Sequence, residues 1–391
     1  MRFHSYFNTA VHLIKAYTGS IPLAHYLKNY FAQHKKHGSK DRKYISHLCY
    51  CYYRLGHALK EMSVEDRLKT AVFLCNDDMT EWAVLFDEAW LANHSNILDT
   101  RIAYLKEVNG FDVSQIFPWH TSFSAGIDVE VFAKSHLIQP DLFLRIRPGK
   151  KSIVTSKLAA ADIYYKQIGD DCLSLLNNSQ VDKILALNEE AVVQDYSSQQ
   201  IASFLRFVQP VTGNQQPVTS IWDCCAASGG KSILAYDTFK HINLTVSDIR
   251  ASIISNLKNR FAEAGIKNYK SFVADLSLTP SALHLTPFDL VICDAPCSGS
   301  GTWGRTPEQL YFFSPGKISQ YTTLQQKITQ NVLPCVKQSG YFLYITCSVF
   351  AAENEAMVSA LQQGGFTLVK SAVLTGYDKK ADTMFAALFK K

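Results

Sequence analysis

The sequence predicts an α/β protein, in which a seven-stranded, mostly parallel sheet follows a small α+β subdomain and an N-terminal all-helical domain. Apolar residues recur at helical spacing through about the first hundred residues, whereas strand-like and helix-like segments alternate from about residue 218 onward. Between about 140 and 205 the predicted elements are short. A chain of 391 residues can form two or three domains, and we expect them at 1–137, 138–212 and 213–391.

The helical domain is predicted from apolar residues that would share one face of each helix. They form the groups Phe7, Ala10, Val11, Ile14; Leu23, Leu27, Tyr30, Phe31; and Ile45, Leu48, Tyr52, Leu55. Ser63, followed by Asp66, is expected to cap the next helix. The basic stretch 34–43 contains Lys40 and Arg42. It is either a solvated loop and helix start or a patch that contacts RNA phosphates without reading the base sequence.

The subdomain is predicted from two segments. Residues 142–149 alternate in polarity like a strand that ends in a turn, and they include Arg145 and Arg147. Residues 194–199 precede a predicted helix at about 201–205, and the polar loop 213–217 marks the last expected boundary. The two arginines could hold nucleic-acid phosphates, or they could form surface salt bridges.

The C-terminal domain is predicted from alternating β and α segments. We expect strands at 221–224, 244–247, 271–274, 290–293, 341–346, 367–370 and 383–389, and helices at about 231–239, 250–264, 318–337 and 352–363. Alternation of this kind implies a mostly parallel sheet with helices on both faces and right-handed crossovers.

Composition excludes several classes of protein. The chain is 47% hydrophobic and 19% charged, and no apolar run is long enough for a transmembrane helix. Its first residues lack the apolar core of a signal peptide. Ten cysteines without regular spacing indicate a reducing, cytoplasmic environment rather than a disulfide framework, and the Cys49-x-Cys51 pair has no partners for a zinc site. The net charge of +5 is compatible with a nucleic-acid partner but does not establish one.

Four acidic residues close four successive predicted strands: Asp223, Asp248, Asp275 and Asp294. The first strand continues through Cys225-Ala226-Ala227-Ser228-Gly229-Gly230-Lys231 into a helix, so that two glycines allow a ligand to approach backbone N–H groups. The turn matches neither the dinucleotide-binding glycine motif nor a Walker loop. A carboxylate at Asp248 could accept hydrogen bonds from ribose hydroxyls, and one at Asp275 from an adenine amino group. The set indicates an adenosine-type ligand.

Two predicted strands deliver a thiol to the same edge of the sheet. One ends in Asp294-Ala295-Pro296-Cys297, and the other ends in Thr346-Cys347-Ser348. Ligands of open α/β sheets collect at the carboxyl ends of the strands. The alternative is that both cysteines are small buried residues, which is the role that we assign to Cys224, Cys293 and Cys335.

Together these motifs resemble the Sun-type (RsmB-like) RNA cytosine-C5 methyltransferases, a family that depends on S-adenosylmethionine. The resemblance rests on Cys-Ala-Ala-Ser-Gly-Gly-Lys, Asp-Ala-Pro-Cys-Ser-Gly-Ser-Gly and Thr-Cys-Ser in that order, and it covers about the last 250 residues. It implies a Rossmann-like class I methyltransferase domain. It also implies that Cys347 is the nucleophile, that Cys297 assists release, that Asp294 acts at the cytosine ring, and that residues 225–231 with Asp248, Asp275 and Asp294 hold the cofactor.

The resemblance has departures and a weaker extension. Ser228 stands where the family usually has proline, which could loosen the turn and lower cofactor affinity, and Arg147 replaces the usual asparagine of the subdomain motif. Ser39 to Arg42 and Tyr50 to Arg54 faintly resemble the NusB-like RNA-binding helical domain of one bacterial branch.

The resemblance implies an RNA substrate, with small-subunit rRNA as our first choice. A cytosine must leave its helix to enter such a pocket, so a loop or single strand is expected. Arg145, Arg147, Arg305, Lys40 and Arg42 are candidate RNA contacts, and we expect no membrane, no metal and a monomer. The alternatives are a tRNA methyltransferase and a non-catalytic rRNA-binding assembly factor. DNA methylation is disfavoured, because DNA enzymes use the Pro-Cys thiol and lack a second Thr-Cys-Ser.

Overall fold

The computed structural model describes residues 2–208, 220–239, 241–278 and 286–391. The chain divides into two compact units. The helical unit comprises residues 1–121, 128–139 and 302–315, and the sheet unit comprises 122–127, 140–301 and 316–391. The three-domain division therefore stays a prediction, and its boundary at 212/213 lies outside the described residues. In the ranges that the structure describes, no helix combines the length and apolar character needed to cross a bilayer.

The helical unit buries the apolar faces that the sequence predicts. Phe7, Ile14, Leu27 and Leu48 are buried, and the Ser63 hydroxyl accepts a hydrogen bond from the Asp66 N–H as the expected N-cap. Its main helices are α1 (Arg2–Ala16), α2 (Leu23–Gln33), α3 (Ser39–Arg54), α4 (Val64–Cys75), α5 (Glu88–Ala92), α6 (Leu98–Asn109), α7 (Val129–Ser135) and α13 (Pro307–Phe312).

Helix α13 belongs to the helical unit although it follows the Cys297 segment in sequence. The buried Arg54 guanidinium donates to the carbonyl oxygens of Ile138 and Gly304, each at 3.0 Å. The His57 ring nitrogen lies 2.9 Å from the Leu310 carbonyl oxygen. These contacts anchor residues 302–315 in the helical unit.

The smaller sheet of the sheet unit has the order β2-β3-β1-β4 and is antiparallel in all its pairings. Its core contains Leu144, Val154, Leu173 and Ala191. The elements here are short, as the sequence predicts: β1 (Leu142–Ile146), α8 (Lys151–Ala160), β2 (Tyr165–Gln167), β3 (Cys172–Leu175), β4 (Ala191–Val193), α9 (Tyr196–Gln199) and α10 (Ala202–Leu205). Of these, β1 and α10 correspond to the strand and the helix expected at 142–149 and about 201–205.

The larger sheet has seven strands in the order β10-β11-β9-β8-β5-β6-β7, which confirms the predicted fold class. Within it, β11 alone runs against the others, since it pairs antiparallel with both β9 and β10. The strands are β5 (Ser220–Asp223), β6 (Asn243–Asp248), β7 (Tyr269–Val273), β8 (Phe288–Asp294), β9 (Val336–Thr346), β10 (Thr367–Leu374) and β11 (Met384–Lys390).

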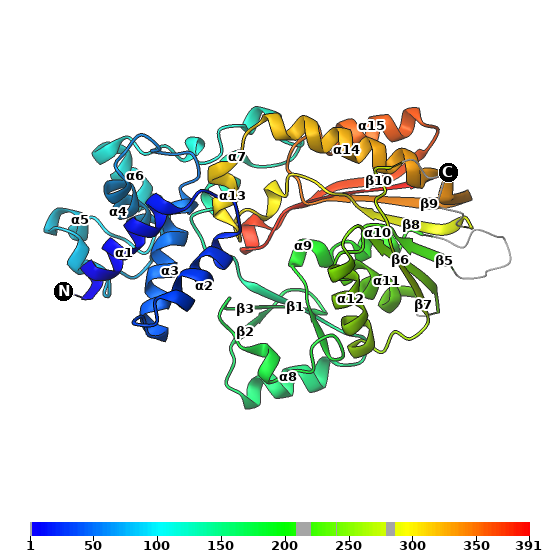
Figure 1. The fold of residues 1–391 in the computed structure, drawn as a ribbon, viewed down its shortest axis with the longest axis horizontal. Helices are drawn as coiled ribbons and strands as arrows, with labels where there is room; N and C mark the ends of the chain where they lie inside the picture. The colour runs from blue at the N-terminus through cyan, green and yellow to red at the C-terminus, as the bar shows by residue number, and fades with distance from the viewer. Residues whose placement is uncertain (1, 209–219, 240, 279–285) are drawn as a thin grey trace. The chain divides into compact units, whose positions relative to one another are not determined.

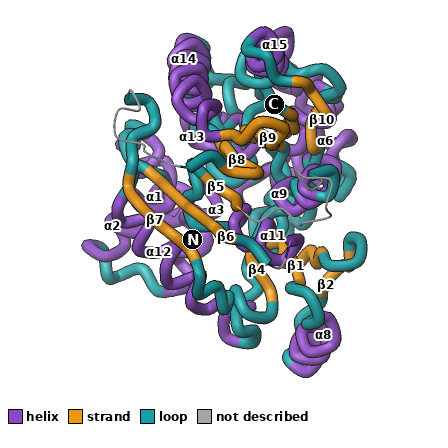
Figure 2. Tube along the Cα trace, turned by 90° about the vertical axis from the view of Figure 1, so that its right-hand side faces the viewer, coloured by secondary structure: helices purple, strands orange, loops and turns teal. Residues whose placement is uncertain are grey.

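Helices cover both faces of this sheet (Figures 1 and 2). Alternate residues of each strand point to opposite faces, so Leu290 and Ile292 pack with α10, α11 (Gly230–Phe239) and α12 (Ala251–Glu263). Val291 and Cys293 pack with α14 (Gly316–Val332) and α15 (Glu355–Gln363). Helix α14 ends five residues before the predicted end, because Pro334 lacks a backbone N–H and lies in a short 3₁₀ turn that leads into β9.

One carboxylate is enclosed at the centre of the larger sheet. Asp223 ends β5 and is 0% exposed. Its Oδ2 accepts a 2.6 Å hydrogen bond from the Ser232 hydroxyl, whereas its Oδ1 has no partner among the described residues. Burial raises the pKa of Asp223, the Ser232 hydrogen bond lowers it, and the nearby Asp294 carboxylate raises it, so that the resulting pKa is about 7.

We predict that Asp223→Asn removes a pH dependence of stability. The folded-state pKa is raised, so the folded protein holds a proton that the unfolded chain releases near pH 4, and wild-type stability falls as pH rises from about 4 to about 7. The variant has no such ionisation. Its free energy of unfolding relative to wild type should therefore increase by about 1.4 kcal/mol per pH unit in that window. Urea unfolding at a series of pH values measures this difference.

Asp289→Asn is the matched control. Burial would raise the pKa of Asp289, but hydrogen bonds from Lys337 and Ser220 lower it to about 2. The stabilisation that ionised Asp289 gives to the folded state is therefore fully present above pH 4. It is lost only as pH falls toward 2. Between pH 4 and 7 its difference from wild type should stay flat. The same flat result for Asp223→Asn would contradict the prediction.

Candidate active site

The carboxyl ends of the parallel strands bring the predicted acids and thiols to one edge of the larger sheet. Asp223 and Asp248 are the last residues of β5 and β6, and Asp294 is the last residue of β8. Asp294 lies opposite Ile345 on β9, two residues before Cys347. The strand order changes direction at β5, between β6 and β8, which is where open α/β sheets bind ligands.

The glycine turn between β5 and α11 has a fixed backbone. The N–H of Ala226 donates to the Ser247 carbonyl oxygen at 2.9 Å, and Ala227 has a φ of 44°. Gly229 has a φ of 83°, and a Cβ there would lie 2.7 Å from the Phe261 ring. Only glycine fits that position without strain, and it lets the chain turn sharply into α11. The N–H groups at the start of a helix are of the kind that can bind a ligand.

Ser228 is held by a side chain rather than by a proline ring. The Arg260 guanidinium donates to the Ser228 carbonyl oxygen at 2.9 Å and lies 2.8 Å from the Ser228 hydroxyl oxygen. Arg260 also donates to the Asn188 side chain at 3.0 Å. This tether restrains the turn at the position where the sequence departs from the family pattern.

Asp248 forms a hydrogen bond with the glycine turn, whereas Asp275 forms local hydrogen bonds with Ser277. Asp248 accepts hydrogen bonds from the Ala227 N–H at 3.1 Å and from the Arg250 side chain at 3.1 Å. Asp275 lies two residues beyond the end of β7, is exposed, and accepts from the Ser277 N–H and hydroxyl at 2.9 and 2.6 Å. Its expected contact with an adenine amino group stays a prediction.

Lys231 and Asp294 form an ion pair at 2.7 Å, with side chains 14% and 21% exposed. Burial alone would lower the pKa of Lys231, but the Asp294 carboxylate raises it and the net shift is upward. Lys231 therefore keeps its proton and holds it directly beside Asp294. The pair joins the first residue after the glycine turn to the strand end that precedes Cys297.

The two predicted thiols lie together. The backbone N–H of Cys347 donates to the Cys297 sulfur at 3.3 Å, and both residues are partly exposed. The Cys297 and Cys347 loops are also joined through backbone, since the Ala295 N–H donates to Ile345 and the Gly301 N–H to Cys347. The hydrogen bond with Cys297, followed by burial and the Asp294 charge, raises the pKa of Cys347. Its thiol must therefore lose a proton before it can act as a nucleophile.

Cys224, Cys293 and Cys335 are buried, as their assignment to packing expects. The sulfurs of Cys224, Cys225 and Cys293 lie within 4.8 Å of one another. Hydrogen bonds from Cys224 and Cys225 lower the pKa of Cys293 to about 6. Three sulfurs at this spacing could hold a soft metal ion, so the expectation of no metal stays a prediction.

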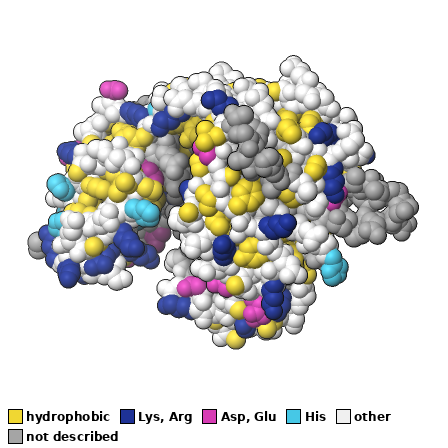
Figure 3. Space-filling model, turned by 45° about the vertical axis from the view of Figure 1, so that its right-hand side comes forward, with side chains coloured by type: hydrophobic (Ala, Val, Ile, Leu, Met, Phe, Trp, Pro, Cys, Tyr) yellow, Lys and Arg dark blue, Asp and Glu magenta, His cyan; other side chains and the backbone are white. Residues whose placement is uncertain are grey.

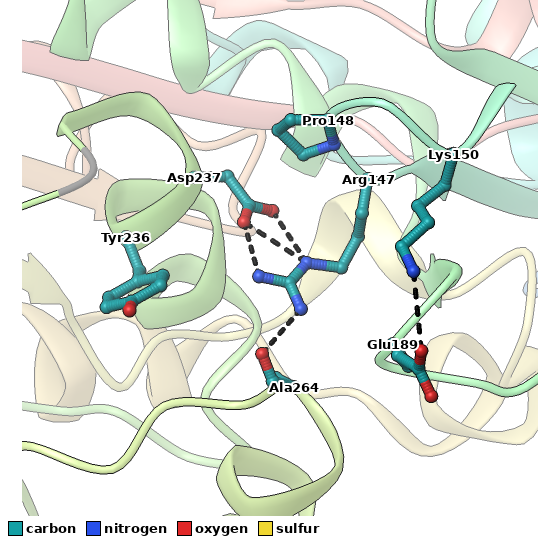
Figure 4. Close-up of a pocket in the computed structure, with 7 residues that line it drawn as sticks. All are labelled: Arg147, Pro148, Lys150, Glu189, Tyr236, Asp237 and Ala264. Carbon is teal, nitrogen blue, oxygen red and sulfur yellow. Dashed lines mark hydrogen bonds and ion pairs between the residues drawn. The ribbon is translucent and has the colours of Figure 1, made fainter.

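Arg145 and Arg147 both form ion pairs with one carboxylate, that of Asp237, inside the sheet unit. They lie 2.6 Å from opposite oxygens of Asp237 on α11, and their side chains are only 7% and 11% exposed. Arg147 also donates to the Ala264 carbonyl oxygen and lines a cavity of about 410 Å³ with Lys150 and Glu189 (Figure 4). The salt-bridge alternative describes this geometry, but the pairs are buried rather than at the surface. The geometry gives no support to a phosphate contact.

The other RNA candidates lie in the helical unit. Lys40 is exposed, with its amine 5.6 Å from the centre of the Tyr44 ring. Arg42 is exposed and donates to the His37 carbonyl oxygen at 2.8 Å, whereas Arg305 is partly buried in the segment that contains α13. On the face that Figure 3 shows, Lys and Arg side chains lie at the surface among side chains of other kinds. Their contact with RNA stays a prediction.

Sequence reasoning missed a residue that connects the Cys297 and Cys347 loops. Glu353 is 0% exposed and accepts hydrogen bonds from Ser298, which follows Cys297, and from Ser348, which follows Cys347. A signal was present, because Glu353 falls inside a segment predicted as a helix that covers an apolar sheet. A carboxylate near such a helix start is usually a cap, so the sequence alone does not mark it.

The chain is similar in sequence to known proteins over part of its length. A sequence model of the family described as "16S rRNA methyltransferase RsmB/F" matches residues 210–382. The "Probable ribosomal RNA small subunit methyltransferase B" of Bacillus subtilis (strain 168) is 26% identical over 239 residues, or 60% of this chain and 52% of that protein. The chain thus spans about half the length of this curated relative.

Two solved structures share the fold. PH0851 gives a TM-score of 0.70 at 18% identity, with 98% of this chain and 97% of that chain covered. NSun6 from Pyrococcus horikoshii, solved with SFG, gives a TM-score of 0.56 at 12% identity over 74% of this chain and 97% of that chain. These identities show likeness of fold alone. The sequence match confirms the resemblance that the motifs indicate, and residues 210–382 carry the pattern of the RsmB/F methyltransferase family.

Proposed function

We propose that the protein transfers a methyl group from S-adenosylmethionine to C5 of a cytosine in small-subunit rRNA, through a covalent bond between Cys347 and C6. The observation that carries the proposal is the 3.3 Å contact between Cys297 and Cys347 beside the Lys231–Asp294 pair, at the edge where the glycine turn opens. Two thiols and the Lys231–Asp294 ion pair lie at the carboxyl ends of neighbouring strands. This set of groups suits addition of one thiol to a pyrimidine ring and later release of the methylated base from that thiol.

The proposed reaction has several steps, and a different group acts in each one. Cytosine C5 is a weak nucleophile, and bonding of the Cys347 sulfur to C6 makes it electron-rich enough to attack a methyl group. In this proposal the Lys231–Asp294 pair donates a proton or hydrogen bond at N3, which withdraws charge from the ring during addition. S-Adenosylmethionine supplies the electrophilic methyl group. Cys297 then assists loss of the C5 proton to a base. The C5–H electron pair forms the C5–C6 double bond, and the C6–sulfur bond breaks with its electron pair returning to the Cys347 sulfur.

Residues 225–231 and Asp248 would hold the adenosine part of the cofactor. The residues present fit that group, because backbone N–H groups at the start of α11 and the Asp248 carboxylate lie together at the turn. Asp248 accepts hydrogen bonds from Arg250. Ribose hydroxyls would compete with Arg250 for the same oxygens.

The RNA substrate is proposed from the likeness to small-subunit rRNA methyltransferases, which extends over part of the chain. A tRNA methyltransferase of the same fold and a non-catalytic rRNA-binding factor are the alternatives. Cytoplasmic location and a monomeric state belong to the same proposal. Bisulfite comparison of total RNA from wild-type and deletion strains tests the substrate: loss of one rRNA methylcytosine supports the proposal, and loss of a tRNA methylcytosine contradicts it.

The non-catalytic alternative needs a separate test. A calorimetric titration with S-adenosylmethionine, followed by a transfer assay on undermethylated small subunits, distinguishes a methyltransferase from an assembly factor. Binding with transfer supports the proposal. Binding to the subunit with neither cofactor binding nor transfer would favour the assembly factor.

We predict that Cys347→Ala abolishes methyl transfer without loss of cofactor binding. The substitution removes the only atom proposed to bond to C6, whereas the glycine turn and the Lys231–Asp294 pair do not depend on this sulfur. Methyl incorporation into undermethylated small subunits should fall to background, and calorimetry should give an unchanged cofactor Kd. Residual transfer at more than about one-hundredth of the wild-type rate would remove Cys347 from its role.

We predict that Cys297→Ala accumulates a covalent protein–RNA adduct. Addition through Cys347 would still occur, but release would lack its assisting thiol, so the adduct should survive a denaturing gel. The double variant Cys297→Ala/Cys347→Ala is the control and should form none. An active RNA substrate that gives no adduct with Cys297→Ala would contradict the assignment of Cys297 to release.

A further inference from the structure

Glu353 is a fully buried carboxylate that lacks a cationic partner among the described residues. It lies two residues before α15 and is 0% exposed. A buried charge is costly unless hydrogen bonds satisfy it, so the donors around Glu353 show what this residue holds in place.

Four donors surround the Glu353 carboxylate, two on each oxygen. Oε1 accepts from the backbone N–H of Ser298 at 2.9 Å and from the Gln325 amide at 3.0 Å. Oε2 accepts from the hydroxyls of Ser298 and Ser348 at 2.6 and 2.5 Å. The carboxylate is therefore fully used as an acceptor, and its bonds are charge-assisted.

Three of these four donors belong to the two loops that carry the thiols. Ser298 follows Cys297, and Ser348 follows Cys347. Ser300 adds a further connection, because its hydroxyl accepts from the Val349 N–H at 2.9 Å. Gln325 on α14 also donates to the Pro296 carbonyl oxygen at 3.0 Å, so the base of the Cys297 loop is held from the same side.

We propose that Glu353 is a positioning residue that fixes the Cys297 sulfur relative to the Cys347 sulfur. The inference rests on the proposed function, since it concerns the two thiols of that reaction. Cys347 comes directly after β9 and is restrained by the strand, whereas Cys297 lies three residues beyond β8. Glu353 reaches the Cys297 loop through both the backbone and the hydroxyl of Ser298. Its loss therefore displaces Cys297 more than Cys347.

The two thiols act in different steps, so displacement of Cys297 should affect one step more than the other. Attack by Cys347 should continue, while release through Cys297 should slow. A displacement of about 1 Å can reduce a rate by about a hundredfold. We expect Glu353→Gln to lower methyl transfer by roughly ten- to a hundredfold and to accumulate the adduct that Cys297→Ala gives. An amide keeps the size of the side chain, but its nitrogen cannot accept the hydrogen bonds that a carboxylate oxygen accepts.

The control is Glu355→Gln, two residues further along the chain. Glu355 accepts hydrogen bonds from the Ser124 hydroxyl at 2.9 Å and the Ala125 N–H at 3.1 Å, and neither donor lies in a cysteine loop. This variant should transfer methyl groups at the wild-type rate and accumulate no adduct. Cofactor Kd should be unchanged in both variants. If Glu353→Gln does not fold, the variant Ser298→Ala is used in its place in every assay. Ser298→Ala removes the hydrogen bond from the Ser298 hydroxyl to Glu353.

A thiol measurement tests the positioning independently of catalysis. Mass spectrometry after brief iodoacetamide treatment gives the alkylation rates of Cys297 and Cys347, with buried Cys335 as internal reference. Glu353→Gln should change the rate at Cys297 several-fold more than the rate at Cys347, and Glu355→Gln should change neither.

The outcomes separate the two proposals. If Cys297→Ala traps no adduct on any RNA, the proposed chemistry fails, and the alkylation rates alone decide the role of Glu353. If Cys297→Ala traps an adduct but Glu353→Gln releases product normally with unaltered cysteine rates, the positioning role is overturned. Equal slowing of attack and release, with no adduct, would also overturn it, because a general loss of structure would then be the cause.

Discussion

The register of β8 against β9 is the constraint on which the rest of the candidate site depends. Asp294 lies opposite Ile345, so Cys297 and Cys347 leave the sheet at the same edge. A shift by one residue would turn every side chain of β8 to the opposite face. The buried apolar residues on both faces, including Ile292 and Val291, prevent that shift, and core packing thereby fixes the chemistry.

Helix α11 connects that edge to the small antiparallel sheet. It begins at the glycine turn, carries Lys231 in its first turn, and carries Asp237 further along. Asp237 holds Arg145 and Arg147 of the β1 region. The arginines therefore fix the position of the helix whose first residues form the turn. Arg145 and Arg147, which the sequence offers as candidate RNA contacts, thus stabilise the fold through Asp237.

Local sequence patterns predicted the helices and strands well, but they did not predict contacts between distant segments. The predicted strands at 290–293 and 341–346 are present, and the Ser63 cap is formed. Pro334 could have corrected the predicted end of α14 from the sequence, because proline lacks the N–H that a helix interior needs. No local signal could place α13 in the helical unit, because Arg54 reaches Gly304 across 250 residues of sequence.

The sequence by itself determined the fold class, the position of Asp223, Asp248 and Asp294 at strand ends, the position of Cys297 and Cys347 shortly after strand ends, and the family resemblance. These features follow from periodicity and from short motifs, which are local properties of the chain. Only the tertiary structure decided which charges are paired: Arg145 and Arg147 with Asp237, Lys231 with Asp294, and Glu353 with the serines beside both cysteines. The reason is physical, because a buried charge takes whichever partner the packed fold brings within hydrogen-bond distance, and that partner can lie anywhere in the sequence.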